Sequence, residues 1–413
     1  MLDVFTVITI EKEEFNLFGK INEANGDIEL HLPMTSTKAI EFARDIIYHP
    51  KINFSVLDMT ALQYSVYGCK FYRTQLSYNN AGINTIIGKF DRLVCEEELD
   101  KKYDTISFSF EGIEKLFPLE SFDTEFGGTD KEIIFSKRKH EIISKNLIDN
   151  IACTIESSFT GVHKSENLYN LDVKQTKVIR FEFVNQKTID ELLEVLYKFK
   201  KYLEFILRQE IKLINIAISN GNSTYIQGKL VYDTILKPQT FIKEIDKSFR
   251  PVDTNKFFKG LNGWLREYEK CSEVIKLWQK TIYNNNVLDE DLFLWKCQAF
   301  ELLCSLYSNI REKANLLKEK RQANPNLKNF MSAVSSLYKF CETLDKKYYK
   351  DVKDVRDKLT HNNPMKTISE DQKKNAFSLI DYFLTKTIAV ICEIGCISTN
   401  LWLKVYSEDG CQT

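Results

Sequence analysis

The sequence predicts an α+β protein in which a β-rich N-terminal domain, residues 1–245, precedes an all-α helical bundle, residues 255–413. Over residues 1–185, short runs rich in β-branched and aromatic residues are separated by turn residues, a pattern typical of strands. At Thr188 a segment begins in which the apolar residues recur every three or four positions, which is typical of a helix, and all of the chain after Pro251 follows the same period. This helical period fades in the stretch between the two domains, and we therefore place the boundary there.

The composition is that of an ordinary globular protein, with 43% apolar and 28% charged residues among 413. This length suffices for two or three domains that each bury a core. The net charge of −1 hides an asymmetry, because residues 1–250 carry −5 and residues 251–413 carry +4. The mildly basic C-terminal part permits contact with a polyanion such as RNA but does not require it.

The ten cysteines are scattered, without Cys-x-x-Cys pairs or nearby histidines. We therefore expect buried free thiols in a reducing cytoplasm, and neither a metal site nor a cofactor. Asp3 and a strand-like alternation follow Met1 directly, so no signal peptide is expected. The most apolar run, Ile388–Leu403, contains Glu393 and is too short to span a bilayer, which indicates a core helix and no membrane contact.

Five runs in the first part of the chain have the residue types expected of strands: Val4–Ile10, Glu14–Gly19, Ile52–Asp58, Ile83–Phe90 and Thr105–Phe110. Ser36–Tyr48 predicts a short helix, and Gly127–Asp130 predicts a turn. A longer helix should begin at Thr188, which has the spacing of a capping box with Glu191. After it, two strand-like runs flank an Asn-Gly dipeptide and predict a hairpin: Ile211–Ser219 and Ser223–Tyr232.

The C-terminal part predicts five helices with short connections, which together indicate an antiparallel bundle. The predicted helices are Leu261–Tyr283, Asp289–Leu317, Leu327–Leu344, Tyr348–Leu359 and Glu370–Tyr406. Asn-rich or Asn-Pro segments stand at three of the junctions between these helices, as expected where helices end.

The fourth of these helices carries Arg356 and His361, with four residues between them. Five steps turn a regular helix by about 140° beyond one full turn, so the two side chains would not share one face. If they act on a common target, the helix must loosen near His361, and the Asn-Asn-Pro run of residues 362–364 favours such a loosening. The alternative is that His361 caps the helix and Arg356 pairs with a surface Asp.

This stretch resembles the R-x4–6-H motif of the HEPN superfamily, many members of which are metal-independent ribonucleases. A polar residue commonly follows the Arg in that family, and Asp357 stands there. The resemblance implies that His361 is the general acid/base and that Arg356 binds the phosphate. It also implies a homodimer through the bundle, since HEPN nucleases usually bring two motifs into one cleft. A second R-x4-H pair, Arg44 and His49, has no helical bundle around it.

Glu301 lies in Leu292–Leu306, a predicted helix that is apolar almost all round, so its carboxylate should be partly buried and require a partner. HEPN proteins often carry a Glu on an early bundle helix that orients the motif Arg, and this segment is similar. We therefore predict that Glu301 pairs with Arg356; the alternative is an exposed Glu on a helix edge.

Basic residues near the motif could bind the RNA backbone. One is Lys358, inside the motif, and four others belong to a patch further upstream: Arg311, Lys318, Lys320 and Arg321. The alternative in each case is a solvated side chain on a helix surface.

The order of elements also resembles ApeA-like proteins of bacterial antiphage defence, which join a β-rich N-terminal region to a C-terminal HEPN bundle. The resemblance implies an endoribonuclease effector of abortive infection that cleaves RNA, possibly tRNA. The N-terminal region would then be a sensor or restraint that responds to a phage-derived activator. The alternative, from a different class, is a non-catalytic HEPN-type dimerisation and ligand-binding protein.

Overall fold

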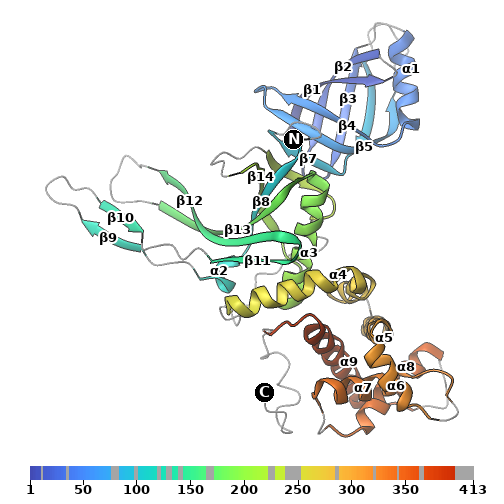
Figure 1. Ribbon diagram of the computed structural model, residues 1–413. Coiled ribbons are helices and arrows are strands. Elements are labelled where there is room, and N and C mark those ends of the chain that lie inside the picture. The colour runs from blue at the N-terminus through green and yellow to red at the C-terminus, as the bar shows by residue number, and fades with distance from the viewer. Residues whose placement is uncertain are drawn as a thin grey trace. The chain divides into compact units, whose positions relative to one another are not determined.

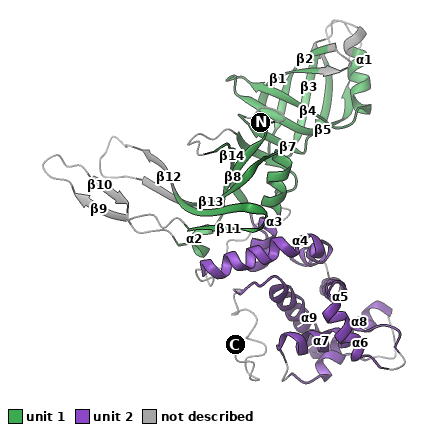
Figure 2. Cartoon of the chain, viewed as in Figure 1, with its two compact units in different colours: residues 1–197, 212–238 green, residues 198–211, 239–413 purple. Residues whose placement is uncertain are grey.

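The computed structural model forms two compact units (Figures 1 and 2). The N-terminal unit comprises Met1–Tyr197 and Lys212–Pro238, and the helical unit comprises Lys198–Ile211 and Gln239–Thr413. The structure describes residues 1–10, 13–33, 37–75, 83–96, 101–118, 122–126, 133–137, 143–163, 172–221, 228–237, 253–283, 288–319, 322–341, 344–361 and 367–395.

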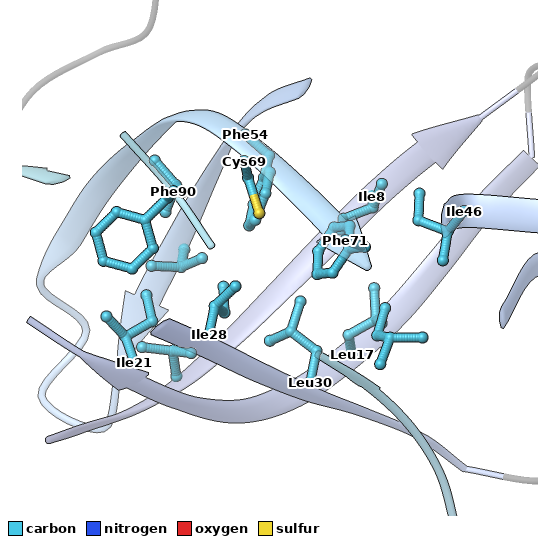
Figure 3. Close-up of a cluster of buried hydrophobic side chains, with 14 of the residues drawn as sticks. Ile8, Leu17, Ile21, Ile28, Leu30, Ile46, Phe54, Cys69, Phe71 and Phe90 are labelled. Carbon is cyan, nitrogen blue, oxygen red and sulfur yellow. The ribbon is translucent and has the colours of Figure 1, made fainter. Parts of the chain in front are cut away.

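Six strands of the N-terminal unit form a closed barrel, in which the neighbours run β5-β4-β1-β2-β3-β6 and β6 pairs back onto β5. The strands are β1 (Leu2–Ile10), β2 (Glu13–Asn22), β3 (Asp27–Pro33), β4 (Ile52–Asp58), β5 (Gln63–Gln75) and β6 (Ile83–Lys89). Along β1 the side chains of Val4 and Ile8 are buried whereas Phe5 and Val7 are exposed, as the two-residue period of a strand requires. The barrel interior is filled by apolar side chains (Figure 3).

The remaining strands extend one edge of this barrel into a larger antiparallel sheet, in the order β7-β15-β14-β8-β13-β12-β11. They are β7 (Arg92–Cys95), β8 (Tyr103–Phe110), β11 (Ile143–Asn146), β12 (Ile151–His163), β13 (Asp172–Lys187), β14 (Leu213–Ser219) and β15 (Gly228–Asp233). A separate two-stranded sheet pairs β9 (Phe122–Phe126) with β10 (Ile133–Lys137).

Five helical segments lie among the described residues of the first part of the chain. Four are short: α1 (Thr37–Asp45), the 3-10 turn η1 (Ile46–Tyr48) that follows it, α2 (Ile113–Leu116), and the 3-10 turn η2 (Ile148–Asn150). The long helix α3 (Ile189–Leu207) begins as predicted, because Thr188 and Glu191 form a capping box: the Glu191 carboxylate accepts from the Thr188 amide at 2.8 Å. The division between the two units falls inside α3, at Lys198.

The helical unit contains six further described helices: α4 (Thr254–Tyr283), α5 (Asp289–Leu306), α6 (Ser308–Leu316), α7 (Leu327–Tyr338), α8 (Lys347–His361) and α9 (Glu370–Ile391). Aromatic side chains join them. Phe383 of α9 makes edge-on contacts with Phe300 of α5 and Tyr349 of α8, and Phe293 of α5 stacks on Phe377 of α9.

Most predicted strands and helix starts are confirmed, but three helices were predicted too long. The single helix expected over Asp289–Leu317 is divided at Tyr307, whose backbone is extended (φ −108°, ψ 112°). No Gly or Pro marks this break, and the apolar period continues through it. The third helix ends at Tyr338, where Lys339 takes a left-handed conformation, and the last ends at Ile391 rather than Tyr406.

Some sequence-based expectations concern segments that the structure does not describe, including the Gly127–Asp130 turn and the chain beyond residue 395. The eight described cysteines are free thiols, and seven of them are buried, as expected. None of the described helices is both long enough and apolar enough to cross a membrane.

Candidate active site

The predicted pair between Glu301 and Arg356 is confirmed: Arg356 Nη2 donates to Glu301 Oε2 at 3.1 Å, which joins α8 to α5. The side chain of Arg356 is 31% exposed and that of Glu301 is 26% exposed. The guanidinium therefore lies at the edge of the packed helices, where a ligand can reach it.

A second carboxylate holds the same guanidinium. Arg356 Nη1 donates to Asp357 Oδ1 at 3.2 Å, and Asp357 Oδ2 accepts from Lys353 Nζ at 2.7 Å. These contacts use two of the five N–H donors of the guanidinium. A planar cation oriented by two carboxylates is suited to bind a phosphate.

The sequence of each helix explains this placement. On α8, Tyr349, Val352 and Val355 recur at helical spacing and turn one face into the core, and Arg356 lies on the margin of that face. On α5 the residues around Glu301 are mostly apolar and several are buried, among them Phe300. Glu301 is thus a charged residue at the rim of a mostly apolar stretch of α5, and it needs the partner that Arg356 supplies.

The contacts among Glu301, Arg356 and Asp357, together with their partial burial, shift the pKa of each of the three groups. Burial raises the pKa of Glu301 above its usual range, and the charge of Arg356 only partly opposes this. For Arg356, burial acts to lower the pKa, but the charge of Glu301 and the bond to Asp357 outweigh it and raise the pKa. Partial burial likewise opposes, but does not overcome, the hydrogen bonds from Lys353 and Arg356 that lower the pKa of Asp357.

His361 is the last residue of α8, and its side chain is exposed. The helix continues up to this residue, with Thr360 Oγ1 donating to the Arg356 carbonyl at 2.8 Å. A regular helix separates the directions of Arg356 and His361 by about 140°. The two side chains therefore do not converge within α8, and the residues that follow, 362–366, lie outside the described part of the chain.

Of the basic residues predicted to bind RNA, Lys358 is half-buried on α8 and Arg311 is exposed on α6. The ammonium of Lys318 donates to the carbonyl of Ala323 at 3.0 Å, so it already supports a local turn. The other two, Lys320 and Arg321, lie outside the described residues.

The second R-x4-H pair lies in the N-terminal unit. Arg44 is exposed in the last turn of α1, and His49 follows η1, where its backbone carbonyl and that of Ile47 accept from Lys70. Its surroundings are the strands of the barrel, not a helical bundle.

A buried charged cluster that was not predicted from the sequence joins the second half of α3 and the turn after it to α4. It is here called the α3 cluster: Lys200, Lys201, Glu204, Glu210 and Tyr283. Lys200 and Lys201 contact the two oxygens of Glu204 at 2.7 and 3.0 Å, and the Tyr283 hydroxyl of α4 donates to the same carboxylate. Glu204 is fully buried. One signal was available, because Lys200 and Lys201 precede Glu204 at spacings of four and three in a segment otherwise rich in aromatic and aliphatic residues.

A second missed cluster, here called the Asp381 cluster, joins the turn after α3 to α5 and α9. Asp381 of α9 accepts from Arg208, just beyond α3, at 2.5 Å and from Lys296 of α5 at 2.7 Å. Burial acts to raise the pKa of Asp381, but these two cations outweigh it and hold the pKa below its usual range. Partners this distant in sequence give no periodic signal.

The fold and the clusters define a two-part protein in which a closed β-barrel with an extended sheet precedes a helical unit that carries an accessible guanidinium held by carboxylates. Residues 9–262, more than half of the chain, match the family model of ApeA N-terminal domain 1. The chain belongs to the ApeA family and is an ApeA-like antiphage defence protein. Comparisons with curated proteins and with solved structures found no significant match.

Proposed function

We propose that this protein is a metal-independent endoribonuclease of antiphage defence and that Arg356, His361 and Glu301 form its active site. The observation that carries the proposal is the accessible Arg356 guanidinium, oriented by Glu301 at 3.1 Å, five residues before an exposed histidine. Family membership supports the biological setting. The likeness of the Arg356–His361 spacing to the HEPN motif supports the reaction class.

The chemistry follows from the residue types. The 2′-hydroxyl oxygen of a ribose attacks the adjacent phosphorus while a base takes its proton, and the bond to the 5′-oxygen breaks as an acid protonates that oxygen. His361 is suited to the proton transfers because histidine titrates near neutral pH. Arg356 is suited to stabilise the charge that builds on the phosphate oxygens. The products are a 2′,3′-cyclic phosphate and a 5′-hydroxyl.

This role requires a second copy of the chain. One histidine cannot readily serve as base and acid in the same step, and α8 directs Arg356 and His361 to different sides. A homodimer through the helical unit would place two Arg–His pairs around one cleft. Lys358 and Arg311 would then contact the RNA backbone, and the N-terminal unit would receive a phage-derived activator.

The test is cleavage of total RNA and of purified tRNA in EDTA by the full chain. We expect Arg356→Ala and His361→Ala each to lower the cleavage rate by about 10³-fold at an unchanged melting temperature, because each removes a group that acts in the transition state. Arg44→Ala and His49→Ala are matched controls, since they remove the same residue types at the same spacing, and should leave the rate unchanged.

Different outcomes separate the alternatives. If the wild-type chain cuts no RNA, even when extract from phage-infected cells is added, the helical unit is a non-catalytic dimerisation and binding module. Cutting that EDTA abolishes would indicate a metal-dependent phosphoesterase instead. Sedimentation of the wild-type chain as a monomer under cutting conditions would refute the shared cleft.

A further inference from the structure

The chain passes through the helical unit twice. After Tyr197 it leaves the N-terminal unit, contributes Lys198–Ile211 to the helical unit, and returns to the N-terminal unit at Lys212. This inserted segment, residues 198–211, is the second half of α3 and the turn that follows it. Both ends of this inserted segment are covalently joined to the N-terminal unit. A conformational change in the N-terminal unit can therefore act on the inserted segment through the backbone.

The inserted segment is anchored by charge rather than by apolar contact alone. The α3 cluster places Lys200, Lys201 and Glu204 at 1%, 3% and 0% exposure and ties them to Tyr283 of α4. Apolar side chains of similar volume at these positions would make the fold as stable as the buried charges do, or more stable. Buried charges tolerate few arrangements, because each must keep its partner, so they define one position of α3 against α4.

The turn after α3 is held equally specifically. Arg208 has a positive φ of 58°, an unfavourable backbone conformation for a residue with a side chain. Its guanidinium contacts Asp381 and donates to the hydroxyl of Thr385, both on α9. These contacts compensate for the strained backbone and fasten the end of the inserted segment to α9.

The carboxylate of Asp381 also connects the inserted segment to α5, the helix that carries Glu301. Asp381 also accepts from Lys296, which lies on α5 five residues before Glu301. Five residues are about 7.5 Å along a helix axis, so a shift of α5 that repositions Lys296 must carry Glu301 with it. Glu301 in turn holds Arg356.

We propose that the inserted segment controls the candidate active site, and that the ion pairs Arg208–Asp381–Lys296 transmit its position through α5 to Glu301 and Arg356. The proposal rests on the proposed nuclease function for its consequence, but its structural part does not. In its restrained state, which the activator would relieve, the N-terminal unit would pull on residues 198–211, weaken the contact of Arg208 with α9, and release α5. Arg356 would then lack its fixed orientation, and cleavage would be slow until the activator is bound.

Hydrogen–deuterium exchange of the full chain, followed by mass spectrometry, tests the structural part without any need for activity. Arg208→Gln removes the charge that binds Asp381. We expect exchange in the α5 and α8 peptides to rise by about ten-fold, because the opening of these helices becomes easier, while the peptides of α6 and α7 stay close to wild type. Arg208→Lys keeps a cation beside Asp381 and should restore most of the protection.

Lys276→Gln is the matched control. It breaks an exposed ion pair of the same unit, Lys276 with Glu273 at 2.7 Å, in which both residues lie on α4. It should leave exchange in α5 and α8 unchanged. An equal rise over all helices in Arg208→Gln would mean that the cluster merely stabilises the unit and would overturn the proposal, as would no rise in α5 and α8.

Cleavage assays then separate this inference from the proposed function. With an active wild-type chain, Arg208→Gln should lower kcat by about ten-fold with little change in KM, because a misplaced guanidinium affects the transition state more than binding. Unchanged kcat despite raised exchange refutes the control of activity but leaves the nuclease standing. A wild-type chain without any activity refutes the nuclease, while the exchange pattern still decides whether residues 198–211 govern α5 and α8.

Discussion

Two charged clusters of the helical unit use the same kinds of residue in opposite ways. In the candidate active site, Glu301 and Arg356 meet at an accessible edge with about a quarter to a third of each side chain exposed. In the α3 cluster, Lys200 and Glu204 meet at 2.7 Å with almost no exposure. An exposed pair contributes little to stability but can exchange a partner for a ligand. A buried pair cannot do this, and the loss of one member leaves an uncompensated charge.

The α3 cluster should give the largest effect on stability. We expect Glu204→Ala to lower the free energy of unfolding by about 3–5 kcal/mol, because Lys200 and Lys201 would remain buried without their shared carboxylate. Urea denaturation of the full chain measures this loss. Glu370→Ala, at an exposed site near the start of α9, should change the value by less than about 0.5 kcal/mol. Equal effects of the two substitutions would contradict the assignment of the α3 cluster as a buried anchor.

Two carboxylates with opposite pKa shifts should respond oppositely to pH. Asp381 has a lowered pKa, so its contribution to folding stability is present above about pH 4 and is lost as the pH falls through the folded-state pKa. Glu301 has a raised pKa, so its contribution to folding stability is present below about pH 4 and is lost as the pH rises through the folded-state pKa.

Denaturation of Asp381→Asn and Glu301→Gln beside wild type, from pH 3 to pH 7, measures this contrast. The destabilisation caused by Asp381→Asn should grow with pH to about 2 kcal/mol at neutrality, since two cations then lose their shared carboxylate. The free energy of unfolding of Glu301→Gln should instead rise relative to that of wild type as the pH rises. Parallel pH profiles for the two variants would show that burial does not dominate at Glu301.

Arg356→Lys should have the smallest effect on stability and a large effect on cleavage. A lysine keeps the charge between Glu301 and Asp357, and the site is partly exposed, so the free energy of unfolding should change by less than about 1 kcal/mol. The planar fork that binds a phosphate is lost, and the cleavage rate should fall by about 100-fold. A variant that cuts RNA at the wild-type rate would remove Arg356 from the proposed mechanism.

Local patterns explain which parts of the fold could be predicted. The capping box of Thr188 and Glu191 depends on residues three positions apart. The mostly apolar helix around Glu301 predicted that its carboxylate needs a partner, and the resemblance to HEPN proteins indicated Arg356 as that partner. Tyr307, by contrast, divides a helix without any Gly or Pro, because the backbone there follows tertiary packing rather than propensity.

By itself, the sequence determined the β-rich and helical parts, the starts of most helices and the need of Glu301 for a partner, because each depends on period, caps or the cost of a buried charge. Only the tertiary structure decided that β6 closes the barrel onto β5, that residues 198–211 join the helical unit, and that Asp381 links Arg208 to Lys296. These features depend on contacts between residues up to 177 positions apart. No short-range pattern encodes such contacts, since they form only when the packed helices and strands bring their side chains together.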